Sequence, residues 1–213
     1  MKKIICLIGP SGAGKGTSAR ILEKYGYTTL SLSQEVRKAV AELGLVNASR
    51  EQLQLMANSI RQERGYDYFA RQVIASDSFQ THDYIVLDGV RNLAELNLIR
   101  RISSEIGASV LILGITANLE NRFNRIILRR DLSDPLTFKE FVRNDEREEG
   151  NSIDLYGQQL SACLQQVDFL LENDGEVEEL EARLYRLISE KEFFPEGKEF
   201  FPEGNINSRI ERM

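Results

Sequence analysis

The segment GPSGAGKGT, residues 9–17, holds the residues of this sequence that are best arranged for chemistry. Gly9, Gly14 and Lys15 have the G-x-x-x-x-G-K spacing, in which glycines let the backbone turn tightly and point successive N–H groups at phosphate oxygens. A helical pattern follows, and the N-terminus of a helix adds partial positive charge. The residues that we expect to contact the phosphates of ATP are Gly9, Ser11, Gly12, Ala13, Gly14, Lys15, Gly16 and Thr17. The alternative is a strand-to-helix turn without a ligand.

The residues around Lys15 predict how a triphosphate and its Mg²⁺ would be held. Lys15 can reach the outer phosphates, so we expect it to be catalytic. The next residue is Gly16, where this type of loop commonly has a Ser or Thr that binds Mg²⁺. The hydroxyl arrives one residue later, at Thr17, which we expect to meet an inner phosphate. Asp88 ends a predicted strand and is the candidate Mg²⁺ ligand, with capping of the next helix as its alternative role.

Apolar runs alternate with helical patterns along most of the chain, which predicts a parallel sheet covered by helices on both faces. The predicted strands are residues 3–8, 28–30, 83–89, 109–115 and 167–171. The expected fold class is therefore α/β, with a three-layer α/β/α sandwich around a five-stranded parallel sheet, and the loop of residues 9–17 resembles that of a P-loop NTPase. Ligands bind at the carboxyl ends of the strands in such sheets, so the segments that follow the strands should form the site.

Local signals mark several helix boundaries. Ser49 and Gln52 form a capping-box pattern that opens one helix. Residues 66–79 are predicted to form a single further helix. The turn at residues 133–135 places Pro135 at the first position of another helix, where its fixed backbone angle is favourable.

These motifs resemble those of the nucleoside monophosphate kinases. GPSGAGKGT is similar to their phosphate-binding loop, and SLSQEVRKA (residues 31–39) is similar to the Ser-Thr-Gly-Asp-x-x-Arg segment of adenylate kinases. LDGVR (87–91) is similar to their Asp-Gly-Phe-Pro-Arg, with one residue fewer. NRIILRR (124–130) is similar to the segment that opens the mobile lid, and GYDYFAR (65–71) to the acceptor region of a small adenylate-kinase-related group. The resemblance covers about residues 1–188.

The resemblance implies an ATP-dependent kinase that acts on a nucleoside monophosphate or a similar small phosphorylated acceptor. The implied acceptor-binding residues are Arg37, Arg71 and Arg91. Asp88 would hold Mg²⁺ through water, and Arg125 and Arg129 would be catalytic residues on the transferring phosphates. Arginine suits such roles because its planar guanidinium binds phosphate oxygens in pairs. The alternative for the arginines of residues 122–129 is a solvated helix face.

Departures from the family pattern keep other functions open. Gln34 stands where the family often has Asp, and only residues 131–140 are available for the lid, which is therefore expected to be short and helical. The pattern from Asp88 to Glu95 also resembles the deoxynucleoside monophosphate kinases of phage type, and dephospho-coenzyme A kinase shares the fold and the short lid. A different class is a nucleotide-binding module that hydrolyses ATP slowly and recruits a partner.

The length allows one kinase-like domain followed by a tail. We expect the domain to span residues 1–190, with an acceptor region at about 31–80 and a lid at about 122–150. Residues 191–213 contain EFFPEG twice and form a tail or linker. The alternatives for this tail are docking on the domain, contact with a second copy of the chain or a downstream partner, and a plain linker.

Composition excludes several function classes. The formal net charge of -6 argues against a general binder of nucleic acid or of a membrane surface. No apolar run approaches the ~20 residues that span a bilayer. The two cysteines show no pairing pattern, so a reducing compartment is expected, and the protein is predicted to be cytoplasmic.

Overall fold

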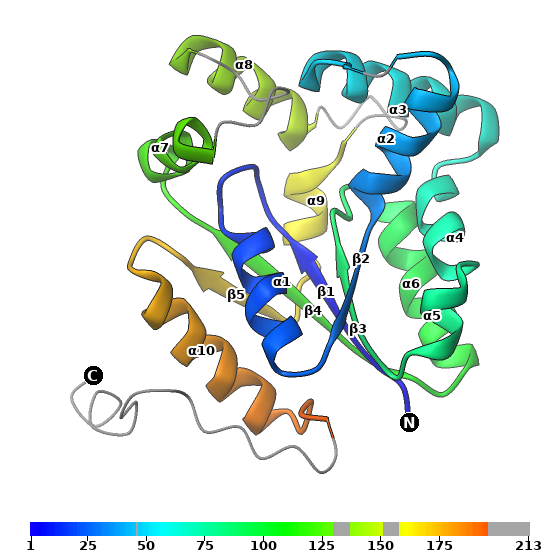
Figure 1. Ribbon diagram of the computed structural model, residues 1–213, viewed down its shortest axis with the longest axis vertical. Helices are drawn as coiled ribbons and strands as arrows, with labels where there is room; N and C mark the ends of the chain where they lie inside the picture. The colour runs from blue at the N-terminus through cyan, green and yellow to red at the C-terminus, as the bar shows by residue number, and fades with distance from the viewer. Residues whose placement is uncertain (46, 130–136, 151–157, 196–213) are drawn as a thin grey trace.

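The computed structural model describes residues 1–45, 47–129, 137–150 and 158–195. At its centre lies a five-stranded sheet whose neighbouring strands are all parallel, in the order β2-β3-β1-β4-β5 (Figure 1). The strands are β1 (Lys3–Ile8), β2 (Thr28–Ser31), β3 (Tyr84–Asp88), β4 (Ser109–Thr116) and β5 (Phe169–Glu172). The predicted fold class and the five predicted strands are therefore confirmed.

Helices cover both faces of this sheet. Those of the described residues are α1 (Lys15–Lys24), α2 (Leu32–Glu42), α3 (Arg50–Arg64), α4 (Tyr68–Ile74), α5 (Asp77–Thr81), α6 (Leu93–Glu105), α7 (Leu119–Arg129), α8 (Phe138–Glu149), α9 (Leu160–Leu164) and α10 (Val177–Glu190). Figure 1 shows α1 and α10 on one face of the sheet, and α3 and α8 beyond the carboxyl ends of the strands. Within the described ranges, no helix has the length and apolar character needed to cross a membrane.

The central strand β1 divides the core into two halves. Its residues are almost all buried, as expected where helices cover both faces of a parallel sheet. Ile4, Cys6 and Ile8 pack with α2 to α6 and α9, whereas Ile5 and Leu7 pack with α1 and α10. This alternation follows from the two-residue period of a strand. Packing on both faces fixes the position of the carboxyl end of β1 and of the loop that follows it.

Capping residues explain several helix boundaries. The capping box of α3 is present, because the Gln52 N–H donates to Ser49 Oγ at 3.3 Å and the Ser49 N–H donates to Gln52 Oε1 at 2.8 Å. The predicted single helix over residues 66–79 is wrong. It is divided into α4 and α5, because Ser76 Oγ accepts the N–H of Phe79 and starts a new helix.

The region of the predicted lid contains α7 and α8. The turn at residues 133–135, with its predicted helix start at Pro135, lies outside the described residues. Helix α8 begins at Phe138, behind a capping box formed by Thr137 and Glu140. The short helix α9 has no counterpart among the predicted elements.

The start of the tail packs against the domain. The ring of Phe193 is buried, and the Tyr27 hydroxyl donates to the Phe193 carbonyl. Phe194 packs edge-on against Tyr25 and Tyr185, with ring centroids 5.7 and 5.2 Å apart. The start of the tail therefore docks on the domain, which is one of the alternatives predicted for it, and the boundary at 190 stays a prediction. The second EFFPEG copy lies outside the described residues, so a tail-mediated partner or oligomer remains a prediction.

Candidate functional site

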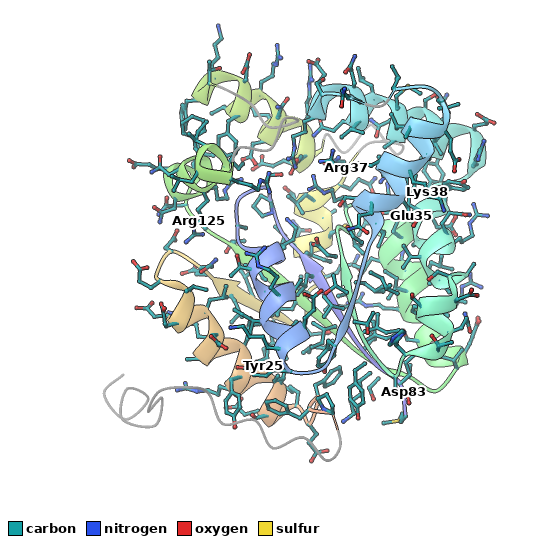
Figure 2. The ribbon with its side chains drawn as sticks, viewed as in Figure 1. Tyr25, Glu35, Arg37, Lys38, Asp83 and Arg125 are labelled. Carbon is teal, nitrogen blue, oxygen red and sulfur yellow. The ribbon has the colours of Figure 1, made fainter. Side chains whose placement is uncertain are left out.

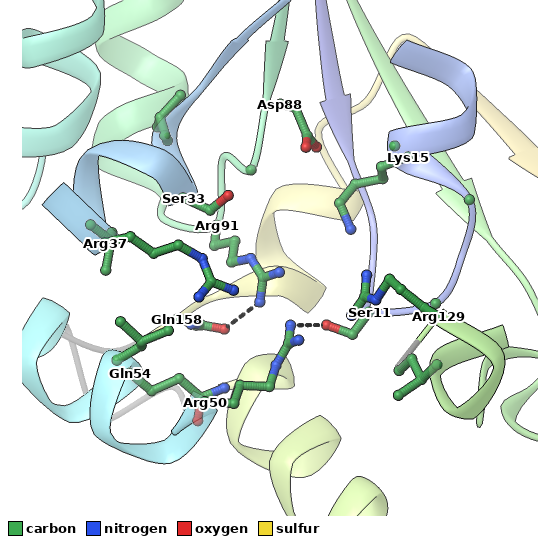
Figure 3. Close-up of a pocket in the computed structure, with 18 of the residues that line it drawn as sticks. Ser11, Lys15, Ser33, Arg37, Arg50, Gln54, Asp88, Arg91, Arg129 and Gln158 are labelled. Carbon is green, nitrogen blue, oxygen red and sulfur yellow. Dashed lines mark hydrogen bonds between the residues drawn. The ribbon is translucent and has the colours of Figure 1, made fainter. Parts of the chain in front are cut away.

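A cavity of about 690 Å³ opens at the carboxyl ends of β1 and β3. Its walls come from the loop before α1, from α2 and α3, from the segment that follows β3, and from the end of α7. Figure 3 shows that the side chains of Lys15, Arg37, Arg50, Arg91 and Arg129 approach this space from different sides. The location agrees with the rule that ligands of parallel α/β sheets bind outside the carboxyl ends of the strands.

Three glycines let the loop of residues 9–17 fit its surroundings. A Cβ on Gly9 would lie 2.1 Å from the carbonyl oxygen of Ile115 in β4. Gly12 has a φ of +79°, and its Cβ would lie 2.4 Å from the carbonyl oxygen of Arg122. Gly14 has a φ of +111° in the left-handed region, which disfavours residues with a side chain. The loop is therefore packed against β4 and α7 in a conformation that requires glycine.

Lys15 begins α1 and lies against the loop. Its Nζ donates to the carbonyl oxygens of Gly9 and Pro10, at 2.7 and 3.0 Å. Burial, and then the nearby Arg91 guanidinium, lower the pKa of the Lys15 ammonium to about 8. A bound phosphate would raise this pKa, because an opposite charge favours the protonated amine.

Gly16 and Thr17 follow Lys15 and line the cavity. A Cβ on Gly16 would meet no atom within 4 Å, so this glycine leaves open space at the start of α1. Thr17 Oγ1 accepts a hydrogen bond from Arg20 at 3.1 Å. The hydroxyl predicted to meet an inner phosphate thus lies in the cavity wall, next to a cation.

We expect Gly16→Ala to raise stability and to weaken ATP binding. Alanine in a helix is favoured over glycine by roughly 0.5–1 kcal/mol, whereas the new methyl group would occupy space that a phosphate needs. Thermal unfolding and an ATP titration measure the two effects. Gly107 is the matched control, because its surroundings are equally open but its φ is +66°, so Gly107→Ala should lose stability. Unchanged ATP affinity in Gly16→Ala would show that the nucleotide does not approach this backbone.

Asp88 ends β3 and lines the cavity. Its Oδ1 is buried and has no hydrogen-bond partner among the described residues. Mg²⁺ prefers oxygen ligands and is usually held by one or two carboxylates together with waters and substrate phosphates. The described residues contain no group of three or more His, Cys, Asp or Glu that could enclose a metal ion. The site therefore fits Mg²⁺ brought with a nucleotide rather than an ion enclosed by protein ligands.

Four of the five predicted arginines line the cavity, and one does not. Figure 2 shows Arg37 on α2 and Arg125 on α7 on opposite sides of the carboxyl ends of the strands, and Arg91 and Arg129 complete the set. Arg125 donates to the carbonyl oxygen of Asn173 at 2.8 Å. Arg71 lies outside the cavity, half-exposed on α4, where its Nε contacts Asp67 at 2.9 Å.

The arginines of α7 do not all lie on a solvated helix face. Arg122 is buried and forms a bidentate ion pair with Asp145 of α8, with N–O distances of 2.5 and 2.6 Å. It also donates to the carbonyl oxygen of Ser11 at 3.3 Å. Arg122 therefore joins α7, α8 and the phosphate-binding loop, and this places Arg125 and Arg129 beside the cavity.

Two residues of the candidate site, Arg50 and Glu148, were not predicted from the sequence. Glu148 of α8 has a side chain that is 1% exposed, and its Oε1 contacts Arg50 Nη2 and Arg91 Nη1, both at 2.7 Å. The Ser11 hydroxyl donates to the same oxygen at 2.9 Å. Burial would raise the pKa of the Glu148 carboxyl, but Arg91, Arg50 and Lys15 together hold it well below its usual range.

A second buried pair supports the side of the cavity that carries Arg91. Arg61 of α3 contacts Glu95 Oε1 of α6 at 3.0 Å, and both side chains are less than 5% exposed. Glu95 Oε2 also accepts the backbone N–H of Arg91 at 3.2 Å. The carboxylate of Glu95 thereby orients the segment that carries Arg91.

The comparisons with known proteins agree with this geometry. Residues 8–137 match the AAA domain family. A UPF0200 protein of Methanoregula boonei is 31% identical over 192 residues, which cover 90% of this chain and 99% of the relative. A UPF0200/UPF0201 protein of Archaeoglobus fulgidus is 27% identical over 188 residues, which cover 87% of this chain, and the chain spans 55% of that longer relative.

Two solved structures resemble the fold. One is TT1252 from Thermus thermophilus, with a TM-score of 0.56 and 21% identity, covering 89% of this chain and 97% of the other. The second is shikimate kinase from Bacteroides thetaiotaomicron, with a TM-score of 0.52 and 13% identity, covering 89% and 98%. At these identities the likeness concerns the fold alone.

Proposed function

The chain belongs to the AAA domain family, in its P-loop kinase-like form, and to the UPF0200 proteins, and from this membership we propose that it is an ATP-dependent phosphotransferase. Its substrates would be ATP with Mg²⁺ and a small phosphorylated acceptor such as a nucleoside monophosphate. The buried, unpaired cysteines Cys6 and Cys163 fit a cytoplasmic enzyme.

One observation carries this proposal, which is the distribution of charge around the cavity. The lining contains eight basic side chains and one acidic side chain, in a chain whose net charge is -6. The first group is Lys15 and Arg129 on the side of the phosphate-binding loop (Figure 3), with Arg125 from the same helix as Arg129. The second group is Arg37, Arg50 and Arg91, on the side of α2 and α3. A triphosphate in the loop would contact the first group. The second group supports a second anion, and therefore an acceptor that carries a phosphate.

The residues also suit in-line phosphoryl transfer. An oxygen of the acceptor phosphate would attack the γ-phosphorus of ATP, the bond between that phosphorus and the β,γ-bridging oxygen would break, and ADP would leave with the bridging oxygen. Such a reaction depends on positioning the two substrates and on stabilising charge on the transferred group. Lys15, Arg125 and Arg129 would stabilise that charge. Asp88 would hold Mg²⁺ through water, and the ion would neutralise charge on the phosphates.

A panel assay of ADP release tests the proposal. The acceptors are AMP, CMP, UMP, GMP, their deoxy forms and dephospho-coenzyme A, with MgATP and an acceptor-free blank. An acceptor-dependent rate supports the kinase and identifies its acceptor, including the deoxynucleotide and dephospho-coenzyme A alternatives. A slow rate equal to the blank for every acceptor would instead favour a nucleotide-binding ATPase or regulatory module.

We expect Arg37→Ala to weaken binding of the acceptor and to leave ATP binding unchanged. Loss of one charge-assisted contact should raise the KM of the acceptor by roughly 10–100-fold. Steady-state kinetics with each substrate varied in turn measures this. Lys38→Ala is the matched control, because Lys38 is the next residue of α2 (Figure 2) but is exposed and does not line the cavity. Equal KM values for the wild type and Arg37→Ala would contradict the assigned role.

A further inference from the structure

The carboxylate of Glu148 lies among groups that otherwise belong to the cavity wall. Its three close partners, Ser11, Arg50 and Arg91, all line the cavity, but Glu148 itself comes from α8. Figure 3 shows the guanidinium groups of Arg50 and Arg91 extending into the space between the phosphate-binding loop and α3. An anion that binds both the loop and the acceptor-side arginines would have to enter this space.

The hydrogen bonds around Glu148 are those of a bound anion. Oε1 accepts from Arg50 Nη2 at 2.7 Å, from Arg50 Nε at 3.0 Å and from Ser11 Oγ at 2.9 Å. Arg91 Nη1 lies 2.7 Å from the same oxygen. A phosphate has three oxygens that accept such donors and carries more charge, so two arginines and a hydroxyl suit it better than a single carboxylate.

The position of Glu148 in its helix would let it leave the cavity. It lies one residue before the end of α8, where helices fray most easily. Asp145, one turn earlier, anchors the helix through its buried pair with Arg122. Fraying of the last turn would release Glu148 without breaking the Asp145 pair.

We propose that Arg50 and Arg91, with the Ser11 hydroxyl, bind the phosphate of the acceptor, and that Glu148 occupies this site as an internal carboxylate that the phosphate displaces. This inference rests on the proposed function, because only that function identifies the anion as the phosphate of an acceptor. Displacement of Glu148 then couples acceptor binding to movement of α8.

This arrangement predicts that the site prefers acceptors with a doubly charged group over acceptors with a single charge. A free carboxylate carries the same single charge as Glu148. It would bind the two arginines less well than Glu148 does, because Glu148 is tethered beside them at a high effective concentration. A phosphate dianion gains additional attraction from the two guanidiniums. The site therefore favours phosphorylated acceptors over carboxylate acceptors.

Anion binding in Glu148→Gln tests the proposal without any measurement of phosphoryl transfer. The phosphate-binding loop is first saturated with a non-hydrolysable ATP analogue and Mg²⁺, and inorganic phosphate or acetate is then titrated by calorimetry. We expect phosphate to bind Glu148→Gln at least about tenfold more tightly than the wild type, and acetate binding to become measurable only in this variant. Glu149→Gln, at the exposed neighbouring position, should behave as the wild type.

The opposite result has a clear structural meaning. If Glu148 only orients the two arginines, its removal will weaken phosphate binding or leave it unchanged, and either outcome overturns the proposal. Failure of both proteins to bind phosphate also overturns it. An active kinase whose phosphate affinity does not respond to Glu148→Gln would defeat this inference alone, whereas a phosphate response without transfer activity would defeat only the proposed function.

A measurement on the wild type covers the case in which Glu148→Gln does not fold. Hydrogen exchange of residues 138–149 is followed with the ATP analogue bound, before and after saturation with phosphate. Displacement of Glu148 should speed exchange at the end of α8 and leave its first turn unchanged. Equal or slower exchange at the end of α8 would show that Glu148 stays in place, and the proposal would be wrong.

Discussion

Replacing Lys15 with methionine is expected to reduce phosphoryl transfer by on the order of 10³-fold while the protein stays folded. The ammonium group lies at the start of α1, beside the loop that would hold the β- and γ-phosphates. Its Nζ donates to the carbonyl oxygens of both Gly9 and Pro10, so it is held against the loop. The measurement is the acceptor-dependent release of ADP under saturating MgATP.

The stability of the same variant separates lost chemistry from lost folding. Burial lowers the pKa of Lys15 to about 8, below its value in an unfolded chain, so the charged form is disfavoured in the native state at pH 7. Methionine keeps the length of the side chain and removes this charge, so thermal stability at pH 7 should be equal or higher. Lys24→Met, at an exposed position of α1, is the control and should keep full activity. Activity within tenfold of the wild type in Lys15→Met would contradict a catalytic role.

The same pKa predicts a pH dependence of ATP binding. In the free protein, Lys15 is protonated below about pH 8 and becomes neutral above it. A bound phosphate would favour the protonated form, so the complex would take up a proton above pH 8 and the affinity for ATP should fall there. Calorimetric ATP titrations at pH 7 and pH 9, in buffers of different ionisation enthalpy, measure both effects. Constant affinity without proton uptake would show that Lys15 does not face the phosphates.

The sequence predicts those parts of the molecule that depend on neighbours along the chain. The glycine spacing in residues 9–17 and the Ser49–Gln52 capping box each involve residues only a few positions apart, and the structure contains both conformations. The five strands follow from their apolar runs, because strands buried on both faces have little polar character. The break between α4 and α5 also had a local signal, the capping residue Ser76, but the continuous apolar pattern hid it.

The residues that sequence reasoning missed are those whose partners lie far along the chain. Arg50 and Glu148 are separated by 98 positions in the sequence. They come into contact because α3 and α8 both lie beyond the carboxyl ends of the strands. Glu148 lies in RNDEREEG, a run of charges that is more typical of a solvated helix face. Arg71, which the resemblance implied at the acceptor, lies outside the cavity beside Asp67, and its role at the acceptor stays a prediction.

Asp145→Ala is expected to be strongly destabilising. The Asp145 carboxylate forms the bidentate pair with Arg122, and both side chains are 8% exposed. Truncation of Asp145 therefore leaves the Arg122 guanidinium buried without its counter-charge. Breaking a buried pair in this way typically costs about 3–5 kcal/mol, because the desolvated charge is no longer compensated. For a chain of this size, the midpoint of thermal unfolding should fall by roughly 6–20 °C.

An exposed ion pair provides the control for this substitution. Glu105→Ala removes the partner of Arg101 on α6, where the two side chains are 53% and 63% exposed and 3.6 Å apart, and it should cost less than about 1 kcal/mol. The double variant Arg122→Met with Asp145→Leu removes both charges and should recover most of the loss, because no buried charge then lacks a partner. Equal losses for Asp145→Ala and Glu105→Ala would contradict the view that Arg122 is buried. Recovery of stability in the double variant would show that this pair mainly satisfies two buried charges, and loss of transfer activity in the same variant would show that it also positions α7 and α8 around the phosphates.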